Sequence, residues 1–235
     1  MANGVLATAI DVIASPATAL KAVKHKPTVL VPLGAIIVAN AVVLLTYYSE
    51  VDVGWLMETG IQASGTEMSE DQREAVARGM ENLSPMLMGS LAVVSAAIGL
   101  TLWFFLNAAY LRGVSLLAND GIGVKAWMSM ICWCGLPLVF GYGASLANLF
   151  VVDASFLPQD RLSPLSFSSL LDLDYAGSGT VWQSVAAMDI TVLWAMALGV
   201  YGYRLWTGRG LLASALIVLA PALLVLGAIS YFTSG

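Results

Sequence analysis

The sequence predicts an all-α polytopic membrane protein with five transmembrane helices and an N-terminal amphipathic interfacial segment. Of the 235 residues, 59% are hydrophobic and 11% are charged, which leaves too little polar surface to solvate a soluble globule. Five apolar stretches each reach the roughly 20 residues that cross the hydrocarbon core of a bilayer. They cover residues 28–48, 85–111, 125–151, 181–205 and 211–232. The connections that join these stretches are acidic and basic in turn.

Basic residues set the expected orientation. Seven of the ten lie before the first stretch, between the second and third, or between the fourth and fifth: Lys21, Lys24, Lys26, Arg112, Lys125, Arg204 and Arg209. The connections over residues 49–84 and 152–180 are acidic instead. Because short loops rich in Lys and Arg stay in the cytoplasm, we expect a cytoplasmic N-terminus and an external C-terminus. The chain is expected to form one membrane domain over residues 1–235, without a cleavable signal peptide.

Residues 1–27 are predicted to form two short helices on the inner leaflet. Val5, Leu6 and Ile10 share one face at helical spacing, Ser15 is a cap, and Pro16 opens a second helix. That second helix has Leu20 and Val23 on one side and Lys21 and Lys24 on the other, as an interfacial helix does. A surface that docks a partner protein is the alternative.

The two outer connections are predicted to differ. In residues 49–84, Ser69 and Gln72 resemble a capping box that opens a solvated helix over residues 70–83, and Ser84 with Pro85 caps the second span. Residues 152–180 could rest on the outer leaflet or cover the bundle. A cation site at Asp172 and Asp174 is the weaker alternative to ordinary solvated acids.

Asp189 is the acid that lies well inside a predicted span. If the fourth span begins near Val181, Asp189 lies about 12 Å along the helix, near the bilayer midplane. A carboxylate at that depth is costly and is a candidate functional group. If the span begins at Ala186, Asp189 is a helix-start acid favoured by the helix dipole.

Four further groups lie at a similar predicted depth. Asn40 and Ser95 belong to the first two spans, and Pro137 in the third leaves the carbonyl oxygen of Trp133 without its helical donor. Together with Asp189 they predict a midplane polar site. Hydrogen bonds that only hold the bundle together are the commoner explanation for such groups.

Other chemistries find little support in the sequence. Cys132 and Cys134 point about 200° apart on one helix, and the single histidine, His25, lies elsewhere, so we expect neither a metal site nor a disulfide. No catalytic motif or cofactor motif is present, and no basic face suits nucleic acid. Small residues in the later spans suit close helix contacts, with Gly141 and Ser145 four residues apart.

The layout resembles the Yip domain family, five-span membrane proteins known for Rab interaction. The similar pieces are Ser15–Pro16 with Ala19–Leu20 and Pro27, residues 121–140 entering the third span, and residues 194–210 before the last. The resemblance implies a cytoplasmic N-terminus, five spans and a short bacterial inner-membrane member. Only about 25 residues precede the first span, and no Rab-binding signature is present, so Rab binding is not implied.

The sequence therefore predicts a non-enzymatic membrane protein that acts through protein or lipid contacts in membrane organisation or trafficking. Its expected partners are membrane lipids, other membrane proteins or further copies of itself. The alternative is a transporter or channel for a small solute, ion or lipid that uses the polar site around Asp189.

Overall fold

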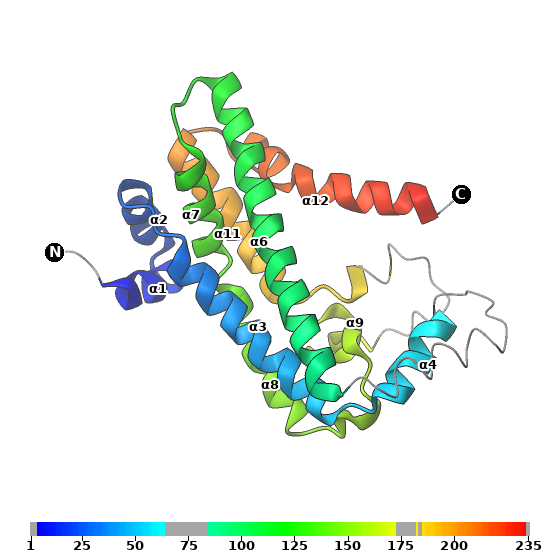
Figure 1. The fold of residues 1–235 in the computed structure, drawn as a ribbon. Coiled ribbons are helices and arrows are strands. Elements are labelled where there is room, and N and C mark those ends of the chain that lie inside the picture. The colour runs from blue at the N-terminus through cyan, green and yellow to red at the C-terminus, as the bar shows by residue number, and fades with distance from the viewer. Residues whose placement is uncertain (1–3, 64–83, 173–181, 183–184, 234–235) are drawn as a thin grey trace.

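The computed structural model describes residues 4–63, 84–172, 182 and 185–233, and this part of the chain is built of helices (Figure 1). The predicted capping box at Ser69, the helix over residues 70–83 and Asp174 lie outside the described residues. In chain order the helices are α1 (Val5–Ala14), α2 (Pro16–His25), α3 (Leu30–Glu50), α4 (Val53–Ala63), α6 (Pro85–Ala118), α7 (Val124–Cys134), α8 (Pro137–Leu149), α9 (Phe167–Leu170), α11 (Ile190–Thr207) and α12 (Leu211–Thr233). Short 3-10 turns occur at Ala154–Phe156 and Gln159–Arg161.

Within the described residues, four helical segments are long and apolar enough to cross a membrane. They are Leu30–Glu50, Pro85–Ala118, Val124–Leu149 and Leu211–Tyr231. These segments confirm the helical, membrane-type fold and correspond to the first, second, third and fifth predicted spans. The fourth corresponds to α11, an 18-residue helix with Arg204 in its last turn, which is not among the four.

The start of α11 corrects one predicted boundary. The fourth span was expected to begin near Val181 or, in the alternative, at Ala186, but Asp189 has extended backbone angles of −83° and 144°. Phe167 N–H donates to the Met188 oxygen and Ile190 N–H donates to the Leu165 oxygen, each at 3.0 Å. This antiparallel pairing uses backbone groups that a helix would need for itself, so α11 begins only at Ile190.

Helix α6 begins where the sequence predicts. The Ser84 hydroxyl accepts a hydrogen bond from Leu87 N–H at 3.2 Å, and Pro85 is the first helical residue. The helix continues past the predicted end at Leu111 to Ala118, where Asn119 adopts a left-handed conformation. At 1.5 Å per residue its 34 residues extend about 51 Å, which exceeds the roughly 30 Å hydrocarbon core.

The third predicted span is interrupted between α7 and α8, at the proline that removes a helical hydrogen-bond donor. Gly135 and Leu136 separate the helices, and Pro137 opens α8. A β-carbon on Gly135 would lie 3.1 Å from Phe104 Cζ and 3.2 Å from Ile36 Cδ1. The break therefore lies where α3 and α6 pack closely against the third span.

Helices α1 and α2 form over the residues predicted, but α2 packs differently from expectation. Its apolar face, with Leu20 and Val23, is buried against α7 and α11 instead of facing lipid. Trp206 Nε1 donates to the Leu20 oxygen at 3.0 Å, and Lys24 Nζ donates to the Trp206 oxygen at 2.8 Å. The expectation of lipid contact at Leu20 is therefore wrong, because α11 supplies its apolar surroundings.

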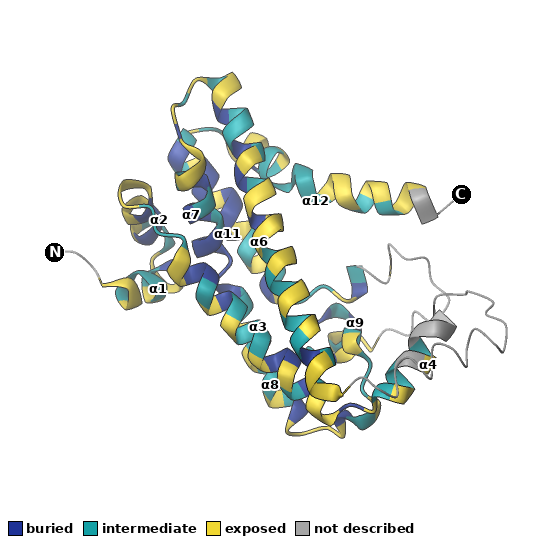
Figure 2. Ribbon diagram, viewed as in Figure 1, coloured by how far each residue is buried: buried dark blue, intermediate teal, exposed yellow. Residues whose placement is uncertain are grey.

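Helix α12 extends away from the other helices (Figure 1). Its N-terminal half packs against α11 through Ile217 and Val218, and its C-terminal half is largely exposed (Figure 2). Leu224 in that half is 71% exposed. Apolar side chains are exposed along α6 as well, as expected of helices whose outer faces meet lipid.

Candidate functional site

Asp189 caps the N-terminus of α11. One carboxylate oxygen accepts a hydrogen bond from Thr191 N–H at 2.7 Å, and the other accepts one from the Ser163 hydroxyl in the connection after α8. This placement matches the helix-start alternative for Asp189. The depth of Asp189 relative to the lipid stays a prediction.

Helix α8 packs against this cap through Gly141. A β-carbon there would lie 2.7 Å from Thr191 Oγ1 and 3.2 Å from Asp189 Oδ2, so only glycine permits the observed approach. The neighbouring Ser145 hydroxyl donates to the Gly141 oxygen at 3.0 Å. The pair of small residues in the sequence thus marks a close helix contact within the chain.

Tyr142 connects the cap to α3. Tyr142 packs against two buried clusters that include Ile36 and Val43 of α3, one turn on either side of Asn40, and its neighbour Gly141 lies close to Asp189. Asn40, Tyr142 and Asp189 therefore form one polar group at the junction of α3, α8 and α11. Tyr142 had not been predicted, because an isolated tyrosine in an apolar run gives no sequence signal.

The other predicted members of the site have different partners. Ser95 is exposed on α6. The backbone oxygen of Trp133 accepts a hydrogen bond from Leu136 N–H at 3.3 Å, and the indole N–H of Trp133 donates to the Thr28 oxygen at 3.0 Å. Pro137 is buried as the first residue of α8.

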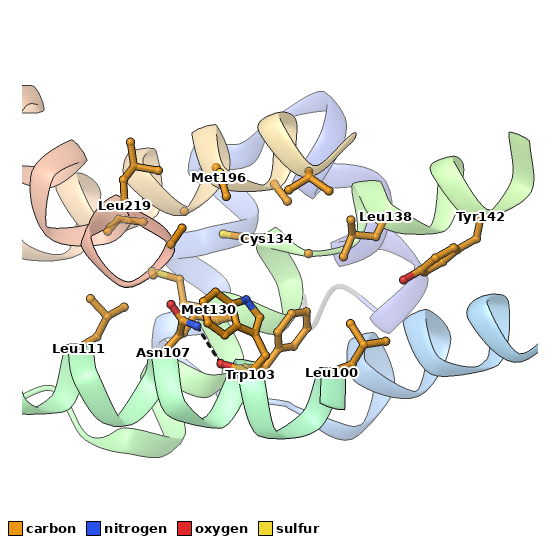
Figure 3. A pocket seen from close by; sticks show the side chains of 18 residues that line it. Leu100, Trp103, Asn107, Leu111, Met130, Cys134, Leu138, Tyr142, Met196 and Leu219 are labelled. Atoms are coloured by element: carbon orange, nitrogen blue, oxygen red, sulfur yellow. Dashed lines mark hydrogen bonds between the residues drawn. The ribbon is translucent and has the colours of Figure 1, made fainter. Parts of the chain in front are cut away.

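An apolar cavity of about 310 Å³ lies beside the polar group (Figure 3). Five helices line it, and its walls include Leu111, Met130, Leu138, Tyr142, Met196 and Leu219. Tyr142 is at one end, while the Asn107 amide on α6 donates to the Trp103 oxygen at 2.8 Å. The sequence did not predict the cavity, because its walls come from α6, α7, α8, α11 and α12.

Cys132 and Cys134 are both buried and free. Only Cys134 lines the cavity. No group of three His, Cys, Asp or Glu side chains suited to a metal ion occurs among the described residues.

The family model of the Yip1 domain matches residues 10–232. Neither the comparison with curated proteins nor the one with solved structures gives a match. The family match covers the segments whose resemblance was apparent in the sequence, and it extends over the intervening spans as well. Because it covers nearly the whole chain, this integral membrane protein belongs to the Yip1 domain family.

Proposed function

We propose that the protein is a non-enzymatic membrane protein that acts through contacts with lipids and other membrane proteins, in membrane organisation or trafficking. The observation that carries the proposal is the arrangement of polar side chains. Asn40, Tyr142 and Asp189 form a local group, while the cavity beside them is walled mainly by apolar side chains. A conduction path for ions or solutes needs polar groups that continue toward both faces. Contact through apolar surfaces fits the geometry better.

We also propose that the chain crosses a bacterial inner membrane five times, with the N-terminus in the cytoplasm and the C-terminus outside. One buried cluster joins Leu20, Leu111, Ile122 and Trp206, so the three basic segments lie at one end of the bundle. At the other end, the connection after α8 is attached to the spans by hydrogen bonds from Tyr47 to the Leu157 oxygen and from Asn148 to the Leu162 oxygen. Helix α11 would extend about 27 Å, which is nearly the thickness of the hydrocarbon core.

Cysteine labelling in intact cells tests this topology. With Cys132 and Cys134 replaced by Ala, Gln159→Cys should react with an impermeant thiol reagent from outside, and Lys125→Cys should react only after permeabilisation. Both native side chains are exposed, so access differs only by membrane side. The opposite labelling pattern would overturn the orientation.

A flux assay tests contact against transport. Protein reconstituted with an enclosed pH-sensitive dye should show no proton flux above that of empty vesicles. A flux that Asp189→Asn abolishes would contradict the proposal, because this substitution keeps the shape and removes the titratable charge.

A photo-crosslinking residue at Leu224 on the exposed half of α12 tests the contacts directly. It should form adducts with lipid and with a protein of discrete mass in native membranes, which mass spectrometry can identify. Failure of both adducts to form, with efficient photolysis, would remove support from a contact role.

A further inference from the structure

We propose that the apolar cavity binds one acyl chain of a membrane phospholipid, with the polar end of that chain at Tyr142. This inference rests on the proposed function and names the ligand class of one site. At about 310 Å³, the cavity lies at the lower end of the range for ligand pockets.

The lining selects a hydrocarbon over a hydrated solute. Met130, Leu138, Met196 and Leu219 supply apolar walls from four helices. A buried water needs two to four polar partners, and the Asn107 amide already donates to the Trp103 oxygen. A void between apolar walls loses dispersion contacts that a flexible methylene chain restores.

The cavity has a side that lipid can reach. Trp103 lines the cavity from α6, and its side chain is 37% exposed. On the facing helix α12, Leu219 and Ala222 line the cavity, and Leu223 immediately beyond is 58% exposed. A chain from the surrounding bilayer can therefore enter between α6 and α12, where the two helices diverge (Figure 1).

The two ends of the cavity differ in polarity. Tyr142 lies at one end, while Leu111 and Leu219 form the opposite end, next to Asn107, whose amide N–H donates to the Trp103 oxygen (Figure 3). A phospholipid chain has the same asymmetry, with an ester at one end and a methyl group at the other. The Tyr142 hydroxyl can donate to the ester carbonyl while the methylenes extend toward Leu111.

Photolabelling of a buried cavity residue by lipid tests the inference. The protein is reconstituted in phosphatidylethanolamine and phosphatidylglycerol vesicles in which a small fraction of the lipid has a diazirine near the end of one chain. After irradiation, adducts should appear on Met130, which is fully buried, and on Leu102, which is 53% exposed on the outer side of α6. An adduct at Leu102 without one at Met130 would overturn the inference.

Two matched phenylalanine variants test whether the lipid chain reaches Met130 through the cavity. Ala195→Phe places a ring in the cavity, whereas Ala197→Phe, on the exposed face of the same helix, does not. Ala195→Phe should abolish the Met130 adduct, and Ala197→Phe should leave it unchanged, with Leu102 labelled equally in both. Ala222→Phe fills the cavity from α12 and supplies the same test if Ala195→Phe does not fold. Retention of the Met130 adduct in a folded cavity-filling variant would refute the inference.

Tyr142→Phe tests the orientation of the chain. It keeps the ring and removes one hydrogen bond, so the affinity for phospholipid measured by native mass spectrometry should fall about threefold to tenfold. No change would overturn the assigned polar end. All these results are independent of the proton flux assay. A cavity that gives no lipid adduct, in a protein without flux, therefore refutes this inference and leaves the proposed function standing.

Discussion

Replacing Gly141 with Ala should destabilise the junction between α8 and α11. The new methyl group would lie 2.7 Å from Thr191 Oγ1 and 3.2 Å from Asp189 Oδ2. Thr191 is β-branched and lies in the first turn of α11, and Asp189 is held by its cap hydrogen bonds, so neither side chain moves away easily. Such overpacking typically costs about 1–3 kcal/mol.

Gly143 in the same helix provides the matched control, because a β-carbon there has no neighbour within 4 Å. Both substitutions gain the same helix propensity, about 0.5–1 kcal/mol. The difference in stability between the variants therefore isolates the clash. It should be about 1–3 kcal/mol, and each kcal/mol corresponds to about 2–4 °C in Tm for a chain of this size.

Thermal unfolding in detergent measures this difference. A thiol-reactive dye reports unfolding, because Cys132 and Cys134 are buried in the folded protein. Gly141→Ala should melt several degrees below Gly143→Ala, and a Thr191→Ala background should reduce the gap by removing the closest atom. If Gly141→Ala melts at or above Gly143→Ala, the packing described at this junction is wrong.

Three further predictions concern side-chain hydrogen bonds. Asp189→Ala should lower stability by about 0.5–2 kcal/mol through loss of the α11 cap, whereas Asp189→Asn should retain most of it, as thermal unfolding can show. Trp206→Phe removes the bond to the Leu20 oxygen at a cost of about 0.5–1.5 kcal/mol, and hydrogen exchange over residues 16–25 should become faster, with Trp182→Phe at an exposed position as the control. Hydrogen bonds from the Ser155 hydroxyl and N–H hold the pKa of the Asp153 carboxyl below its usual value, so Ser155→Ala should raise that pKa in an NMR titration. Because the folded pKa is lowered, the stabilising effect is present above the unfolded pKa and is lost as pH falls through the folded one, and an unchanged pKa in Ser155→Ala would contradict the assignment.

Hydrophobic run length and cap residues predict much of this fold. Ser84 and Pro85 mark the start of α6, and Pro16 marks the start of α2, because caps and first-turn prolines act locally. The start of α11 was not predictable in the same way. It depends on backbone pairing between Leu165–Phe167 and Met188–Ile190, a tertiary contact that periodicity does not encode.

The candidate site was likewise predictable only in part. Asp189 and Asn40 were identifiable as polar residues in apolar runs, but nothing in the sequence indicated that Tyr142 would join them. The cavity could not be predicted from the sequence at all, because each of its walls is an ordinary apolar helix face. Its volume depends on how α12 diverges from α6, and that angle is set mainly by the packing of the N-terminal half of α12 against α11.

The docking of α2 on Trp206 has a consequence for how the protein is made. Leu20 and its hydrogen-bond partner are 186 residues apart, so at about 5–20 residues per second α2 emerges roughly 10–40 s before α11 exists. During that interval Leu20 and Val23 have no α11 to cover them, and the membrane surface is the apolar environment within reach. The amphipathic pattern of α2 therefore suits two successive environments, first the lipid surface during synthesis and then the completed bundle.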